Sequence, residues 1–264
     1  LKIETPYSKI SDFFAMRFLR FNHDMKWFND HVQLEGNFIN SYIHTKDLAY
    51  FAPALADYNE PLSFNGFVHG KVNNLKGKKL TLGINRKTYL NGNMAIQGLP
   101  DLDHIKYDIL LTPSMIEYNL ISRLVPEIKK ITLPKFELLG NIQVAGNIKG
   151  VNDSLQLGLS MATNLGKIAT NIHFSLPDKG VPSYKGTLNT ANFNLGRFIN
   201  VPDVGYIDIL NYFEGRGFEK NELTINIKSS IPQLQIKSNT IQHINADVSI
   251  KGNVLTFSTI SKDN

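Results

Sequence analysis

Apolar and polar residues alternate with a period of two through most of this 264-residue chain. Every second residue of segment 155–161 is apolar, and segment 168–176 repeats the pattern. Successive side chains of a β-strand point to opposite faces, so each such segment predicts a strand with one apolar and one polar face. Antiparallel sheets with one solvated face show this alternation, whereas strands of buried parallel sheets are apolar throughout.

Short gaps rich in Asn, Gly, Asp and Lys separate these strands, for example at 73–74, 152–154 and 178–180. Such residues favour hairpin turns. Three other stretches, at 47–56, 118–130 and 196–214, are apolar without alternation, and each contains a proline. We interpret them as short helices or caps. The sequence therefore predicts an all-β chain, a long antiparallel meander with a few short helical cap segments.

Composition narrows the class of protein further. Hydrophobic residues make up 42% of the chain, which excludes general disorder, and the absence of cysteine excludes disulfides and zinc–thiolate sites. The net charge of +5 is too small and too scattered to predict a nucleic-acid partner. We find no apolar run close to the roughly 18 residues of a membrane helix, so no transmembrane segment is expected. The chain opens in a strand-like pattern without an initiator Met, which indicates a piece of a longer protein.

Chemistry-bearing motifs are scarce. The seven histidines form none of the short H-x-H, H-x-x-x-H or H-E-x-x-H spacings of metal sites. The acid/His cluster at 101–104 has the residue types of a cation site or an acid/base pair, but we interpret it as a solvated turn. The aromatic group at 13–28 is expected to line the core or a groove. We predict no catalytic residue, no metal and no cofactor, and therefore no enzyme.

A faint internal repeat has a period of about 75 residues. Segment 47–53 is similar to 119–126, and a Gly-rich strand and then an alternating strand follow each of them. We therefore expect strands continuing from a preceding repeat at 1–45, a first repeat at 46–117, a second at 118–195 and a third, partial one at 196–264. This period is longer than the roughly 20–50 residues of common solenoid repeats.

Three motifs carry a resemblance to a known family. They are SYIHTKDLAYFAP at 41–53, GNMAIQGLP at 92–100, and LGNIQVAGNI at 139–148 followed by ATNLGK at 162–167, YKGTL at 184–188 and FNLG at 193–196. Their order resembles the repeat unit of the Bacteroidetes branch of the TamB family, in the AsmA-like superfamily. The resemblance covers about residues 40–200. Family members are much longer and carry an N-terminal membrane anchor and a C-terminal conserved domain.

The resemblance implies a sheet curled like a taco around an apolar groove. It implies a bridge in the periplasm that conducts phospholipid acyl chains toward the outer membrane, in a full-length protein anchored in the inner membrane. It also implies a TamA-like outer-membrane barrel as partner. The expected lipid-binding residues are Phe64, Val68, Leu80, Leu82, Ile84, Met94, Ile96, Ile142, Val144, Ile148, Leu155, Leu157, Leu159, Met161, Ile168, Ile172, Phe174, Leu188, Leu223, Ile225, Ile227 and Val248.

Other interpretations stay open from the sequence. Free sheet edges would suit a scaffold or chaperone that assists outer-membrane protein assembly by β-strand addition. A carbohydrate-active or adhesive β-protein is less favoured, because glycosidases use carboxylates in a cleft and the apolar positions above hold none. In a closed and fully packed β-solenoid, the same apolar residues would be core.

Overall fold

The structure is a computed structural model that describes residues 3–4, 6–48, 61–84, 87–101, 104–124, 128–129, 131–151, 153–177, 179–219, 222–252 and 254–261. Contacts divide the chain into two compact units. The first comprises Leu1–Met115 with Lys149–Asn152, and the second comprises Ile116–Ile148 with Asp153–Asn264. The expected division into 75-residue repeats stays a prediction.

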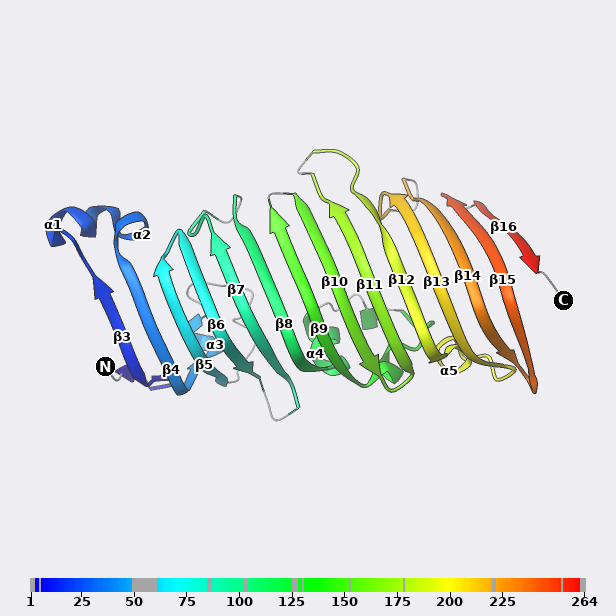
Figure 1. Ribbon diagram of the computed structural model, residues 1–264, viewed down its shortest axis with the longest axis horizontal. Helices are drawn as coiled ribbons and strands as arrows, with labels where there is room; N and C mark the ends of the chain where they lie inside the picture. Colours follow the sequence, from blue (N-terminus) through cyan, green and yellow to red (C-terminus); the bar gives the residue numbers. More distant parts are fainter. Residues whose placement is uncertain are drawn as a thin grey trace. The chain divides into compact units, whose positions relative to one another are not determined.

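The first unit is built on long antiparallel strands (Figure 1). Its strands are β1 (Ile3–Glu4), β2 (Lys9–Ile10), β3 (Asp12–Arg17), β4 (Gln33–His44), β5 (Pro61–Lys71), β6 (Asn74–Gly83), β7 (Tyr89–Gln97) and β8 (Lys106–Glu117), which ends across the border between the units. Consecutive strands from β4 to β8 pair with each other, and β2 and β3 both pair with β4. The short helical segments are α1 (Phe21–Asp24), η1 (Met25–Trp27), α2 (Phe28–His31) and α3 (Thr45–Leu48).

The second unit repeats this plan with eight further strands. They are β9 (Asn141–Val151), β10 (Ser154–Thr163), β11 (Gly166–Ser175), β12 (Ser183–Asn194), β13 (Val204–Arg216), β14 (Thr224–Ile236), β15 (Asn239–Lys251) and β16 (Val254–Ser261). From β10 to β16 each strand pairs antiparallel with the next. Its helical segments are α4 (Tyr118–Leu124), η4 (Phe136–Leu139) and α5 (Leu195–Ile199).

The predicted fold class is confirmed, because all strands except β3 follow chain order in an antiparallel meander that does not close into a barrel. Helix α4 lies inside the predicted cap at 118–130. Most of the predicted cap at 47–56 lies outside the described residues. The cap predicted at 196–214 is wrong beyond α5, because β13 occupies 13 residues from Val204. Leu210 and Tyr212 point outward and are 52% and 44% exposed, so apolar residues on both faces hide the alternation of this strand.

Three β-bulges share one arrangement. In each, a non-glycine residue with positive φ donates its backbone N–H to an Asn or Asp carboxamide or carboxylate oxygen of the next strand. The pairs are Asn40–Asn65 at 2.7 Å, Lys79–Asn93 at 2.8 Å and Asn192–Asp208 at 2.5 Å. A bulge adds one residue to one strand and so changes which face the following side chains occupy. At Asn192 the register shifts between Thr190 and Phe193, which turns Phe193 onto the apolar face beside Ile207.

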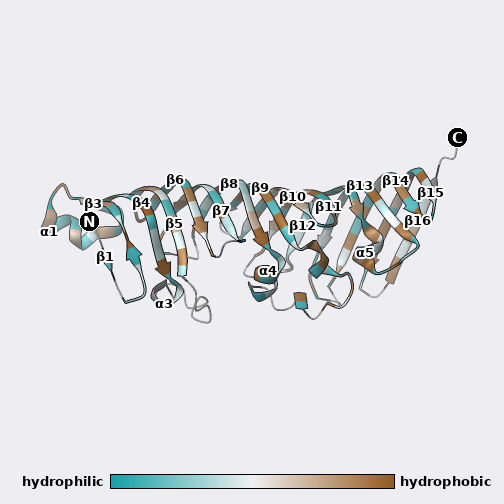
Figure 2. Cartoon of the chain, turned by 90° about the horizontal axis from the view of Figure 1, so that it is seen from below, coloured by the Kyte–Doolittle hydropathy of each residue, from teal (hydrophilic) through white to brown (hydrophobic). Residues whose placement is uncertain are grey.

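The core of the second unit lies near one end of its strands. Leu165, Phe193 and Ile207 are buried together, and Leu138, Leu139, Leu195 and Phe198 of η4 and α5 pack against them. Figure 2 shows α4 and α5 on the same side of this unit's strands. The helical segments therefore cover the apolar face at that end, where a small core forms.

The aromatic group at 13–28 is placed differently from our expectation. Phe13, Phe21 and Trp27 are 44%, 62% and 58% exposed, so the expected core position is wrong for these three. Phe13 pairs with Asn37 on β4, on the strand face opposite Phe14, and Phe21 and Trp27 lie in or beside the short helices. Among the described residues, no helix is both long and apolar enough to cross a membrane.

Candidate functional site: the apolar face of the sheet

Two cross-strand ladders run over seven strands of the second unit. Directly paired residues of an antiparallel sheet share one face, so the strand register identifies the members. The first ladder is Leu157, Ile172, Gly186, Phe213, Ile227, Val248 and Phe257. The second ladder is Leu155, Phe174, Tyr184, Gly215, Ile225, Ile250 and Leu255. We call these two ladders together the apolar face.

The structure brings most of the predicted lipid-binding residues of this unit onto one surface. Seven are members of the two ladders: Leu155, Leu157, Ile172, Phe174, Ile225, Ile227 and Val248. Four lie further along the same strand face in the same register: Leu159, Met161, Ile168 and Leu188. Ile142, Val144 and Ile148 lie on β9, and Leu223 immediately precedes β14.

The first unit groups its predicted residues in the same way. Val68 pairs with Gly77, which pairs with Met94, and Ile96 pairs with Leu75 on the same face. Phe64 pairs with Leu82. Leu80 pairs with Gly92, and Ile84 lies just beyond the end of β6. The alternation therefore identified a shared face in this unit too.

Exposure distinguishes a packed interior from an open face. Of the 22 predicted residues, only Ile142 and Val144 are buried, each at 5% exposure. The other 20 remain partly exposed, and Leu188 is 38% exposed. The small core described above involves Leu165, Phe193 and Ile207 instead. Most of the aliphatic residues that the strands share are therefore neither fully buried nor fully exposed.

Five ladder members are absent from the lipid-binding residues predicted from the sequence: Tyr184, Phe213, Ile250, Leu255 and Phe257. Phe213 lies in the stretch 196–214, which the sequence analysis assigns to a cap. Ile250, Leu255 and Phe257 follow the apolar alternation of β15 and β16, and that alternation predicts their place on this face. Tyr184 lies over Gly215, where an added Cβ would sit 2.4 Å from its ring.

Tyr184 is held from several sides. Its ring stacks on Phe218 with centroids 5.4 Å apart and an interplanar angle of 4°, and its hydroxyl donates to the carbonyl of Gly217 at 3.3 Å. Phe174 and Phe213 contribute tilted ring contacts at 6.3 and 6.4 Å. Burial raises the pKa of the Tyr184 hydroxyl. An aromatic cluster therefore anchors the second ladder at its centre.

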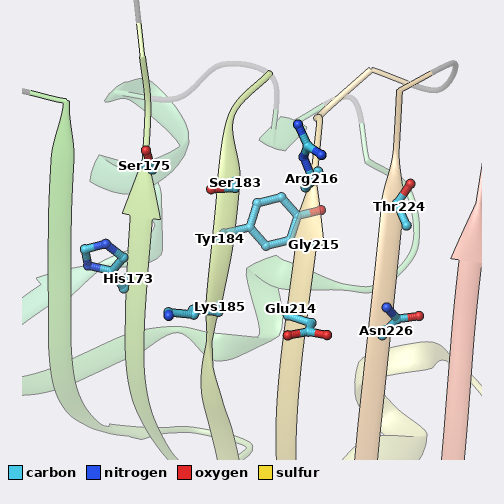
Figure 3. Close-up of a pocket in the computed structure, with 10 residues that line it drawn as sticks. All are labelled: His173, Ser175, Ser183, Tyr184, Lys185, Glu214, Gly215, Arg216, Thr224 and Asn226. Atoms are coloured by element: carbon cyan, nitrogen blue, oxygen red, sulfur yellow. The ribbon is translucent and has the colours of Figure 1, made fainter. Parts of the chain in front are cut away.

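The opposite face of the same strands is polar. His173, Lys185, Glu214 and Asn226 form one row in register, and Ser175, Ser183, Arg216 and Thr224 form the next. Figure 3 shows these two rows around a shallow hollow of about 420 Å³, with Tyr184 and Gly215 between them. Charges of both signs in a row suit a solvated face. The acid/His pair at 101–104 is similarly exposed, with Asp101 Oδ2 2.8 Å from His104 Nδ1, while residues 102 and 103 lie outside the described residues.

The chain thus offers one extended apolar surface and one solvated surface on the same strands. Comparison of the chain with known protein families, with curated proteins and with solved structures finds no match.

Proposed function

We propose that this chain is a segment of a bridge-like lipid transfer protein that conducts phospholipid acyl chains along its apolar face. The observation that carries the proposal is the pair of ladders, 14 cross-strand positions that are aliphatic, aromatic or glycine and lie on one face. Soluble proteins rarely leave large contiguous apolar patches uncovered, and such patches mark binding surfaces.

The chemistry of the face suits movement along it better than capture at one point. An acyl chain gains about 0.8 kcal/mol for each CH₂ removed from water. The ladder residues include no Asp, Glu, Lys, Arg or His, so neighbouring positions offer a tail similar interaction energies. On such a uniform surface, the free energy of a bound acyl chain has no deep minimum that would hold the chain at one position. Headgroups would remain in water beyond the face.

The cellular setting follows from the family resemblance and is part of the proposal. A TamB-like segment would lie in the periplasm between the inner and outer membranes, carry phospholipid toward the outer membrane, and work with a TamA-like barrel. No catalytic step is required, because transfer needs only a path of low and even free energy.

Native mass spectrometry of the chain, purified without detergent, tests the proposal. We expect co-purified phospholipid, and we expect Leu157→Arg to lose it because an acyl chain does not compensate the desolvation of a guanidinium. Gln156→Arg is the matched control, since Gln156 is adjacent in sequence but exposed on the polar face in register with His173. Equal lipid content in both folded variants, or no lipid in the parent chain, would overturn the proposal.

A second candidate function rests on β16. Val254, Leu255 and Phe257 are 64%, 65% and 60% exposed, and among the described strands β16 pairs only with β15. An apolar strand with an unpaired edge can receive another strand. A scaffold for outer-membrane proteins would use this edge. Thr256→Pro should then abolish capture of a barrel-strand peptide and spare lipid, with Thr256→Ala as control; unchanged capture would exclude this function for β16.

A further inference from the structure

A compact cluster of metal-ligating side chains lies away from the apolar face, in the short helices that join β3 to β4. His23 and Asp24 belong to α1, and His31 belongs to α2. One ligand atom from each of the three residues lies within 4.8 Å of those of the other two. In Figure 1, α1 and α2 stand together at one end of β3 and β4.

Asp24 is the centre of the cluster. Its side chain is only 5% exposed, and its Oδ2 accepts the backbone N–H groups of Leu19 at 2.7 Å and Arg20 at 2.8 Å. Its other oxygen, Oδ1, lies 3.3 Å from Nδ1 of both His23 and His31. The Arg20 N–H bond is the main reason that the pKa of Asp24 falls to about 2, although desolvation acts in the opposite direction. The two backbone N–H groups therefore fix the orientation of the carboxylate.

We propose that His23, Asp24 and His31 form a binding site for a divalent transition metal ion of the zinc type. Zinc binds imidazole nitrogen at about 2.0–2.1 Å and carboxylate oxygen at about 2.0–2.2 Å, usually in a tetrahedron, whose ligand atoms are then about 3.3–3.5 Å apart. The two Nδ1–Oδ1 separations of 3.3 Å fit such an edge. They are longer than the roughly 2.7–2.9 Å of charge-assisted N–H···O bonds.

The surroundings leave space for a fourth ligand. The side chains of His23 and His31 are 55% and 39% exposed, so water can reach the point where the three ligand atoms converge. The two imidazole rings lie with centroids 5.1 Å apart and an interplanar angle of 31°. Two histidines, one carboxylate and a water complete four-coordination. A side chain from a partner protein could take the fourth coordination position in place of the water.

The helices that carry the site are attached to the sheet. Asn73, in the turn between β5 and β6, donates its side-chain Nδ2–H to Asp30 Oδ1 at 2.6 Å and its backbone N–H to the carbonyl of Asn29 at 3.1 Å. Val32, directly after His31, is fully buried. A metal ion would therefore join α1 to α2 at a point where α2 is already held, and would act as a structural clamp on this connection.

Isothermal titration of the untagged chain with ZnCl₂ tests the site. We expect one Zn²⁺ per chain, with affinity reduced at least tenfold in His23→Ala and in His31→Ala. His104→Ala is the matched control, because His104 also lies beside an aspartate. That pair is exposed, and no second histidine joins it among the residues that the structure describes. Unchanged affinity in both site variants, or no Zn²⁺ binding by the parent chain, would overturn the proposal.

A second measurement keeps the test decisive if a variant fails to fold. Adding Zn²⁺ to the parent chain should shift the side-chain ¹⁵N resonances of His23 and His31 and leave those of His104 and His173 unchanged. Shifts spread evenly over all histidines, or none at His23 and His31, would contradict the site. Binding of Co²⁺ should produce the intense visible absorption of a tetrahedral centre; a weak octahedral spectrum would argue against the proposed geometry.

Discussion

Leu157 on β10 and Ile172 on β11 are direct cross-strand partners, and both side chains remain partly exposed. In a packed β-sandwich such a pair would be covered by a second sheet, because an apolar strand face is stable only when it is buried. Here the same pairing continues to Phe257 on β16. The fold thus builds a continuous apolar surface and covers only part of it.

The small core should carry more of the stability than the open face. Phe193 is 4% exposed and contacts Phe198 edge-on at 5.3 Å, so Phe193→Ala should lower the free energy of unfolding by about 3–5 kcal/mol. Phe257 is 60% exposed, and Phe257→Ala should change it by no more than about 0.5 kcal/mol. Urea unfolding followed by circular dichroism measures both. Equal losses would show that the apolar face is packed in solution.

Two neighbouring glycines should respond oppositely to alanine. Gly146 has a φ of +143°, and an added Cβ would lie 2.0 Å from the carbonyl oxygen of Gly158. Backbone strain alone should then make Gly146→Ala destabilising by at least about 1–3 kcal/mol. A Cβ on Gly158 meets nothing within 4 Å, so Gly158→Ala should be neutral or stabilising by up to about 1 kcal/mol. Thermal unfolding of the two variants compares them, and similar midpoints would refute this account of Gly146.

The partly buried hydroxyl of Tyr184 should make the free energy of unfolding fall at alkaline pH. Burial raises its pKa in the folded state above the ordinary value of 10.0, so the unfolded chain loses this proton first as the pH rises. The contribution of Tyr184 to stability is therefore complete below about pH 10 and is lost as the pH rises toward the folded-state pKa. In Tyr184→Phe this part of the decline should disappear. Measurements of the unfolding free energy of the parent chain and of Tyr184→Phe between neutral pH and pH 11 test this prediction. Parallel curves would show that Tyr184 does not cause the decline.

The strand pattern was readable from the sequence because one face of each strand is apolar and the other is not. The alternation in 155–161 and 168–176 predicted β10 and β11 and placed Leu157 and Ile172 on one face. It failed for β13, where Leu210 and Tyr212 add apolar side chains to the outward face. Periodicity reports the difference between two faces, so a strand that is apolar on both loses the signal.

The His23–Asp24–His31 cluster was not readable from spacing. Short metal motifs rely on one regular helix or turn that brings ligands three or four residues apart together. Here the ligands are up to eight residues apart and converge because α1, η1 and α2 turn back on each other within 11 residues. Phe21 and Trp27, on the same connection between β3 and β4, are exposed although the sequence predicted a core position, and the reason is related. Apolar character predicts burial on a strand, but these short helices have little sheet surface to cover them.

Photo-crosslinking to a radiolabelled phospholipid identifies the face of the sheet that acyl chains contact. A photoreactive amino acid placed at Leu157 would project from the apolar face, and the same residue placed at Gln156 would project from the polar face. We expect lipid adducts at position 157 and background labelling at position 156. Equal labelling at the two positions, or labelling at 156 alone, would contradict the assignment of this face as the lipid path.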